Sequence, residues 1–186
     1  MIKKIISNTI VILVLAVVYS GKNSWLVLKF YLPAYLTALG TMSSAATLGV
    51  ALECAHKSPV LDKKVSDFSI PLFANIHLCG SVLTEVFFVC VVSQLLYSRL
   101  PELSTLVLFI FLLGVFAVGA PGVPGGTVLA SLGIVISVLG FDDAGTALLI
   151  AIFALQDSFG TACNITGDGA LTLITDTFMK RYSPFS

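Results

Sequence analysis

The sequence carries very little charge for its length. Of its 186 residues, 11% are charged and 57% are hydrophobic, and the formal net charge at pH 7 is zero. A soluble domain of this size needs a far more polar surface, so the composition predicts an integral membrane protein in contact with the lipid bilayer. The balanced charge gives no reason to expect nucleic acid or an acidic macromolecule as a partner.

Cysteine motifs are missing as well. Cys54, Cys79, Cys90 and Cys163 form no CxxC pair and no Cys/His spacing of the kind that binds zinc. They lie in or beside apolar stretches, where cysteine behaves as a small hydrophobic residue. We expect reduced packing residues, with Cys79 as the one candidate for another role.

Apolar stretches recur along the chain and are separated by short polar segments. The first follows two lysines, and no signal-peptide cleavage pattern comes after it, so we expect a membrane helix within residues 1–21. Two longer helices are expected over residues 68–98 and 145–180. Residues 53–67, which are rich in basic side chains, are expected to form a polar loop.

Two further apolar runs are interrupted near their middle. Residues 25–54 contain Pro33 and the small, polar cluster GTMSSAAT at 40–47, and residues 103–141 contain GAPGVPGGT at 119–127. Proline removes a backbone donor and breaks the hydrogen-bond ladder of a helix. Each run therefore predicts two half-length helices that meet at a turn, which is the pattern of a re-entrant hairpin.

The order of hairpin and long helix occurs twice, and the charges favour two inverted copies. If the loop at 53–67 is cytoplasmic, six basic residues fall on that side, namely Lys22, Lys57, Lys63, Lys64, Lys180 and Arg181. Glu102, Asp142 and Asp143 then fall outside, and only the lysines at the N-terminus disagree. The expected fold is all-α and integral to the membrane, with long transmembrane helices and two oppositely oriented re-entrant helical hairpins that form an inverted repeat.

Four polar residues share one face of the last helix. Asp157, Thr161, Asn164 and Asp168 follow steps of four, three and four, which places them on one side of a helix. Carboxylates in apolar surroundings are costly unless a partner compensates them. The stripe predicts a functional site, and the alternative is a buried hydrogen-bonded seam between helices.

A second polar group interrupts the helix expected over residues 68–98. It comprises NIHLCGS at 75–81 and, one turn further on, Glu85. Gly80 can unwind the helix there and expose carbonyl groups as ligands. The alternatives are that His77 is a packing histidine and that Glu85 is a protonated acid bonded to a carbonyl.

These motifs, in this order and spacing, resemble the dicarboxylate/amino acid:cation symporter family, the glutamate-transporter homologues. SSAATL at 43–48 resembles the tip of that family's first hairpin, and GVPGG at 122–126 matches the tip of its second. NITGD at 164–168 matches the binding run of its last helix. PLFANIHLCGS at 71–81 aligns with the family's PLGATINMDGT.

The resemblance implies a cation-coupled secondary transporter of a small organic solute, and no enzyme. It implies a single transport-core domain over residues 1–186, a multi-pass location in the cell membrane, and no cofactor beyond sodium as the coupling ion. The implied substrate-binding residues are Ser43, Ser44, Val123, Asp157, Thr161 and Asn164. The implied cation-binding residues are Asn75, His77, Asn164 and Asp168. Glu85 is the implied carrier of a coupled proton, with His77 as a second candidate.

Three departures from the family pattern change these expectations. Gly160 stands where members that carry acidic substrates have an arginine, so a neutral or zwitterionic amino acid is expected. Cys79 and His77 replace an aspartate and an asparagine, so one sodium site loses its carboxylate and protons are expected to share the coupling. Family members are longer than this chain. A homotrimer is therefore expected only if the missing scaffold helices are supplied, and the alternative is a truncated or split gene product without transport activity of its own.

An intramembrane aspartyl protease is a different class that also requires two membrane aspartates. The GxGD pattern of such proteases is absent, because Thr166 and Gly167 precede Asp168. Asp157 and Asp168 lie on one helix, about 16 Å apart at 1.5 Å per residue. Carboxylates that share a proton must be in contact, so this class is not expected.

Overall fold

The computed structural model describes residues 2–182, which form eight helices and no strand. The helices are α1 (Ile2–Ser20), α2 (Trp25–Thr41), α3 (Ser44–Lys57), α4 (Lys63–Ile76), α5 (Cys79–Tyr97), α6 (Leu103–Ala117), α7 (Gly126–Leu139) and α8 (Asp143–Tyr182). The all-α expectation is therefore confirmed for the described residues. Residue 1 and residues 183–186, at the two ends of the expected domain, lie outside them.

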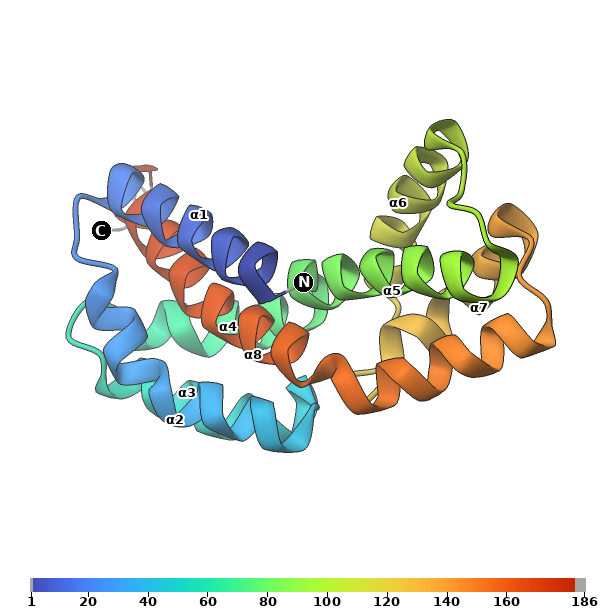
Figure 1. Cartoon of the computed structure of the whole chain (residues 1–186). Coiled ribbons are helices and arrows are strands. Elements are labelled where there is room, and N and C mark those ends of the chain that lie inside the picture. Colours follow the sequence, from blue (N-terminus) through green and yellow to red (C-terminus); the bar gives the residue numbers. More distant parts are fainter. Residues whose placement is uncertain (1, 183–186) are drawn as a thin grey trace.

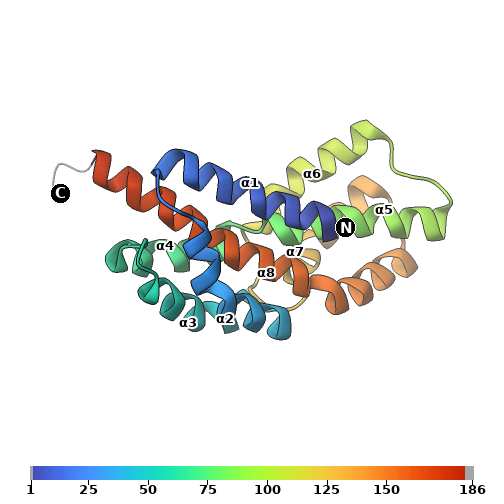
Figure 2. The ribbon, with the colours of Figure 1, turned by 60° about the vertical axis from the view of Figure 1, so that its left-hand side comes forward.

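The long helix α8 is the element on which most of the others pack. Its 40 residues span about 60 Å at 1.5 Å per residue. Figure 1 shows α8 running the length of the molecule and changing direction near its middle. Helices α1 to α4 lie along its C-terminal half and α5 and α7 along its N-terminal half, whereas α6 packs against α7 (Figure 1). The rotated view of Figure 2 also shows α1 to α4 gathered along the C-terminal half.

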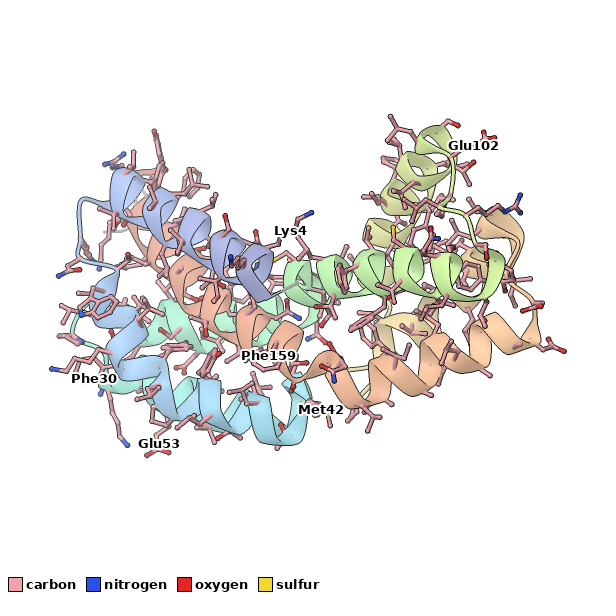
Figure 3. All side chains as sticks on the ribbon, viewed as in Figure 1. Lys4, Phe30, Met42, Glu53, Glu102 and Phe159 are labelled. Atoms are coloured by element: carbon pink, nitrogen blue, oxygen red, sulfur yellow. The ribbon has the colours of Figure 1, made fainter. Side chains whose placement is uncertain are left out.

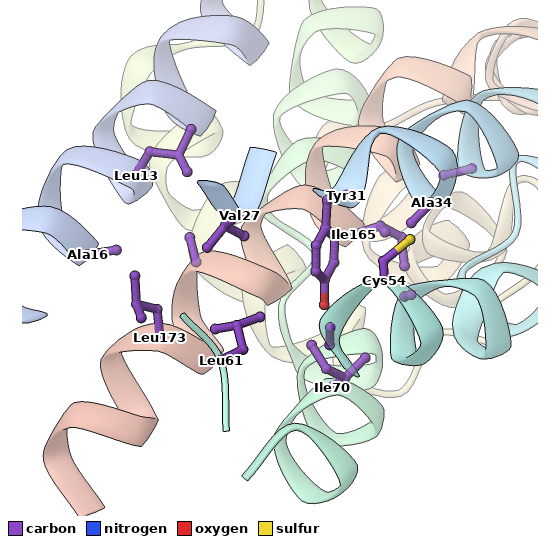
Figure 4. Close-up of a cluster of buried hydrophobic side chains, with 14 of the residues drawn as sticks. Leu13, Ala16, Val27, Tyr31, Ala34, Cys54, Leu61, Ile70, Ile165 and Leu173 are labelled. Atoms are coloured by element: carbon purple, nitrogen blue, oxygen red, sulfur yellow. The ribbon is translucent and has the colours of Figure 1, made fainter. Parts of the chain in front are cut away.

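Two separate apolar clusters hold these two groups of helices. The first joins α1 to α4 with α8 and includes Tyr31, Ile165 and Leu173 (Figure 4). The second joins α5 to α7 with α8 and includes Phe109 and Phe153. The polar stripe of α8 begins at Asp157, between Phe153 of the second cluster and Ala162 of the first.

Both expected interruptions are present. Helix α2 ends at Thr41 and α3 begins at Ser44, with Met42 in the left-handed region at φ 52° and Ser43 capping α3 by accepting a hydrogen bond from the amide of Ala46 (3.1 Å). Helices α6 and α7 are separated by residues 118–125, and Gly125 has φ +75°, a conformation that suits glycine. Both breaks therefore fall within the predicted clusters, the first at Met42 and Ser43 and the second in the segment that contains prolines and glycines.

The polar loop predicted over residues 53–67 is wrong at both ends. Helix α3 continues to Lys57, whose ammonium pairs with Glu53 one turn earlier (2.6 Å). Helix α4 begins at Lys63 because Asp62 caps it, accepting hydrogen bonds from the amides of Lys64 (2.9 Å) and Val65 (3.2 Å). The loop is only residues 58–62, and the helix predicted from residue 68 starts five residues earlier.

Two further details of the helix prediction also change. Pro33 lies inside α2 without ending it. The helix predicted over 68–98 is broken at His77 and Leu78 rather than at Gly80, which lies inside α5. Counted across that break, residues 63–97 are one of two described segments long and apolar enough to cross a membrane, and α8 is the other.

Charged residues lie at both ends of the folded molecule. Figure 3 shows Glu53 and Glu102 at opposite ends of the molecule. At the Glu53 end, the buried carboxylate of Asp176 pairs with Lys22 and with Lys180, each at 2.7 Å. The ammonium of Lys22 also donates to the carbonyl of Val60 (3.1 Å), so the connection between α1 and α2 is joined here to α8 and to the 58–62 loop.

Candidate functional site

The two helix breaks, far apart in sequence, touch each other. The hydroxyl of Ser43 donates to the carbonyl of Gly122 (2.6 Å), and the amide of Ala45 donates to the same carbonyl (3.3 Å). The first amides of a helix have no partner within the helix, so a carbonyl from the other break satisfies one of them. A Cβ at Gly122 would lie 3.1 Å from the nitrogen of Ala45, so the contact favours glycine there.

A small cavity lies beside this contact and reaches α8. Its volume is about 20 Å³, which is room for about one water molecule. Four of the residues predicted to bind substrate line it: Ser44, Val123, Asp157 and Thr161. Ser43 adjoins it through its hydrogen bond to Gly122. The structure therefore brings residues from both breaks and from α8 to one point.

The first turn of α5 carries polar groups to the α8 stripe. Ser81 donates from its hydroxyl to Asp157 Oδ1 (2.8 Å) and accepts from Asn164 Nδ2 (3.0 Å). The amide of Gly80 donates to Asn164 Oδ1 (2.7 Å). Asn164 thus does not line the cavity itself but is hydrogen bonded to Ser81, which does.

Gly80 has a different role from the one predicted. It does not break the helix but allows α5 to approach α8, because a Cβ there would collide with the carbonyl oxygen of Gly160 and lie 2.8 Å from Cys163 Cβ. Gly160 is equally crowded, since its Cβ would lie 3.0 Å from both Asp157 Oδ1 and Ser81 Cα. Glycines on both helices therefore permit the contact between Ser81 and Asp157.

Asp168 lies deeper and is completely buried. Its Oδ1 is 2.8 Å from His77 Nδ1, while its Oδ2 has no hydrogen-bond partner among the described residues. His77 Nε2 is in turn 2.8 Å from Cys79 Sγ. A buried carboxylate oxygen without a partner is costly unless a cation or a proton compensates it. Two of the predicted cation-binding residues, His77 and Asp168, are therefore in direct contact.

Asn75 lies apart from the other predicted cation-binding residues. Its side chain is exposed and donates to the carbonyl of Pro71 (2.8 Å). Its backbone carbonyl belongs to the last turn of α4, where carbonyl groups lack partners within the helix. Only this carbonyl, and not the amide side chain, is available for the predicted cation site.

Glu85 is also completely buried, but it faces α7 rather than the small cavity. The hydroxyl of Ser131 donates to Glu85 Oε1, and Oε2 has no hydrogen-bond partner among the described residues. The carboxyl group therefore lies where α5 packs against the helix that follows the second break. Nothing in the sequence pattern identified Ser131 as its partner.

Two other residues make contacts that the sequence pattern does not predict. Ser81 connects Asp157 with Asn164, and its place beside Gly80 in the NIHLCGS cluster is the one sequence signal for this role. Asn8 donates from its amide to Cys79 Sγ (2.9 Å), and its signal is a polar side chain within the first apolar stretch.

Comparison with known proteins gives a consistent result. The family model described as the sodium:dicarboxylate symporter family matches residues 1–178. Excitatory amino acid transporter 1 of Homo sapiens is 29% identical over 164 residues, which cover 88% of this chain and 30% of that protein. Excitatory amino acid transporter 3 of Mus musculus is 33% identical over 148 residues, which cover 80% of this chain and 28% of that protein. The chain thus spans about 30% of the length of the curated relatives that it matches.

Proposed function

Because the chain belongs to the sodium:dicarboxylate symporter family, we propose that it is the transport core of a secondary transporter that couples a small organic solute to sodium ions, protons or both. The observation that carries the proposal is the meeting of the two helix breaks beside Asp157. A binding site between broken helices is the arrangement that this class of transporter uses. The family also indicates that the chain is no enzyme.

In this proposal the helix pairs α2–α3 and α6–α7 are re-entrant hairpins of an inverted repeat within one transport-core domain. The support is that each pair breaks at a short non-helical segment and that the two segments touch. The outer surface suits a multi-pass protein of the cell membrane, since large side chains such as Val18 and Leu103 are each 77% exposed.

We propose a neutral or zwitterionic amino acid as the solute. Asp157 supplies a carboxylate for an amino group, and the described residues that line the cavity include no lysine or arginine. An arginine at position 160 has no space, because even a Cβ there is in close contact with Asp157 and Ser81. The names of the relatives indicate amino acids as a class, but a second carboxylate would find no charged partner here.

Solute entry requires the two breaks to separate. A cavity of about 20 Å³ cannot hold an amino acid, so the structure represents a closed state of the proposed site. Val123 at the second break is exposed, and two hydrogen bonds to Gly122 hold the breaks together. In this proposal the 118–123 segment moves away from Ser44 to admit the solute.

The coupling cation in this proposal binds at Asp168, where Oδ2 has no hydrogen-bond partner. Asn164 and the carbonyl groups of the last turn of α4, including that of Asn75, complete the proposed ligand set. Imidazole and thiol groups are poor ligands for sodium, so His77 and Cys79 argue for fewer sodium ions than in relatives with acidic substrates. Glu85, with His77 as the second candidate, is the proposed proton carrier.

A binding assay tests the site without requiring transport. The purified chain is heated in sodium or choline buffer with serine, alanine, glutamate or succinate, and protection against thermal unfolding is measured. We expect sodium-dependent protection by a neutral amino acid and none in an Asp157→Asn variant. Asp143→Asn, an exposed carboxylate of the same helix, is the matched control. Protection by succinate without an amino group would contradict the role of Asp157.

The second candidate is a core that binds solute but does not carry it alone. It is favoured by the coverage of about 30% of the relatives' length, which leaves the scaffold and its trimer to another segment or chain. Uptake by reconstituted vesicles distinguishes the two candidates. Binding without uptake, restored when the scaffold helices are supplied, supports this second candidate.

A further inference from the structure

Two cysteines that have no role in the proposed transport cycle are in contact inside the molecule. Cys79 begins α5 and Cys163 lies on α8, and the two thiol groups lie close enough to interact directly. The other cysteines, Cys54 and Cys90, lie on α3 and further along α5. A pair of thiols from distant parts of the chain, brought into contact, is chemically different from four isolated packing residues.

Helix α1 holds both thiols in place. Asn8 donates from Nδ2 to Cys79 Sγ (2.9 Å), and the next residue, Thr9, forms a hydrogen bond with Cys163 Sγ (2.9 Å). Consecutive polar residues in an otherwise apolar helix thus each contact one sulfur atom. Residues from three helices therefore fix the position of the pair.

The backbones on either side of the pair approach each other closely. A Cβ built on Gly80, the residue after Cys79, would lie 2.8 Å from the Cβ of Cys163. The amide of Gly80 donates to the side chain of Asn164, the residue after Cys163 (2.7 Å). A disulfide requires Cβ atoms about 3.5–4.5 Å apart, and these two contacts hold the residue after each cysteine against the opposite helix.

Each sulfur adjoins an apolar cavity. Cys79 lines a cavity of about 550 Å³ together with Lys4 (labelled in Figure 3), Asn8 and apolar residues of α5 and α6. Cys163 lines a second cavity of about 250 Å³, with Thr9 and Phe159 among its walls. Small uncharged molecules can enter such cavities, whereas charged reagents are disfavoured there.

We propose that Cys79 and Cys163 form a dithiol modification site that a small uncharged peroxide oxidises to a disulfide. Hydrogen peroxide first converts the Cys79 thiol to a sulfenic acid and releases one water. The Cys163 thiol then attacks that sulfur, the S–O bond breaks, the S–S bond forms, and a second water leaves. Two thiols lose two electrons and two protons in total, and the peroxide O–O bond accepts them.

The disulfide would link the start of α5 to α8 next to Asn164. It would restrict the break at His77 and Leu78, because the first residue of α5 could no longer move relative to α8. The cross-link chemistry does not depend on the proposed transport function. Its test therefore measures the covalent bond and not uptake.

The test uses the full chain with Cys54 and Cys90 changed to serine. A maleimide–polyethylene glycol reagent added after denaturation should attach to both remaining cysteines before peroxide treatment, to neither after it, and again to both after a reducing agent. Intact mass should fall by two hydrogen atoms. The matched control changes Cys79 and Cys54 to serine and keeps Cys90, which lines the same cavity as Cys79. That variant should keep both tags.

Two results would overturn the proposal. One is that both tags persist in the first variant at a peroxide dose that oxidises a free small-molecule thiol completely. The other is that Cys79 gains oxygen atoms and no cross-linked species forms. If the variants do not fold, mass spectrometry of digested wild-type protein replaces them: a peptide pair joining Cys79 to Cys163 supports the proposal, and its absence after peroxide treatment refutes it.

Discussion

Replacing Gly80 by alanine tests the contact on which the candidate site depends. The new Cβ would collide with the carbonyl oxygen of Gly160 and would lie 2.8 Å from Cys163 Cβ and 3.0 Å from Asn164 Oδ1. The backbone oxygen cannot rotate away, so the start of α5 must move outward from α8. That movement lengthens the hydrogen bond from the Gly80 amide to Asn164 and the bond from Ser81 to Asp157.

The size of the effect follows from these contacts. Overpacking typically costs about 1–3 kcal/mol, and a buried amide left without its partner costs about 1–3 kcal/mol. Both terms arise from one displacement and partly overlap, so we expect a loss of about 2–4 kcal/mol in the free energy of unfolding. For a chain of this size the melting temperature should fall by about 5–15 °C.

The assay is thermal unfolding of the purified chain in detergent, followed by loss of the monodisperse peak on size exclusion. Gly133→Ala is the matched control, since Gly133 lies inside α7 and a Cβ there would meet no described atom within 4 Å. Alanine should leave the control unchanged or stabilise it by about 0.5–1 kcal/mol. If Gly80→Ala melts at the wild-type temperature, the close approach of α5 to α8 is not a determinant of stability and the reasoning fails.

Three further predictions concern charged groups. Asp168→Asn keeps the shape of the side chain but removes its charge. The apparent affinity for solute in sodium buffer, measured from thermal protection, should therefore fall at least tenfold, the equivalent of about 1.4 kcal/mol. Unchanged sodium dependence would refute the cation assignment. Glu85→Gln should abolish the pH dependence of uptake and the proton flux in a reconstituted assembly with its scaffold, and if both persist, Glu85 is structural. Outside the membrane segments, the backbone amide of Gly145 and then the Tyr97 hydroxyl hold the pKa of Asp142 below its ordinary value. Because a depressed pKa stabilises the charged, folded form, this contribution is complete above the unfolded value of about 3.9 and is lost as the pH falls further. Melting curves from pH 7 to 3 should therefore lose less stability in Asp142→Asn than in wild type, and parallel curves would contradict the prediction.

Local chemistry made several features predictable from the sequence. The all-α class follows from long apolar runs, and the two helix breaks follow from clusters of glycine, proline and small polar residues. The alignment of Asp157, Thr161, Asn164 and Asp168 follows from the helical repeat, and the structure buries all four on α8. These features depend on residues close together in the chain, so no knowledge of the packing was needed.

Only the tertiary structure decided which groups meet. The bond from Ser43 to Gly122, the insertion of Ser81 between Asp157 and Asn164, and the partner of Glu85 on α7 all join segments far apart in the chain. Such contacts depend on how closely two helices approach, and here glycines at the crossing of α5 and α8 set that distance. The helical repeat can place a side chain on a face, but it cannot specify which backbone fills the space opposite, because that depends on the packing of the whole chain.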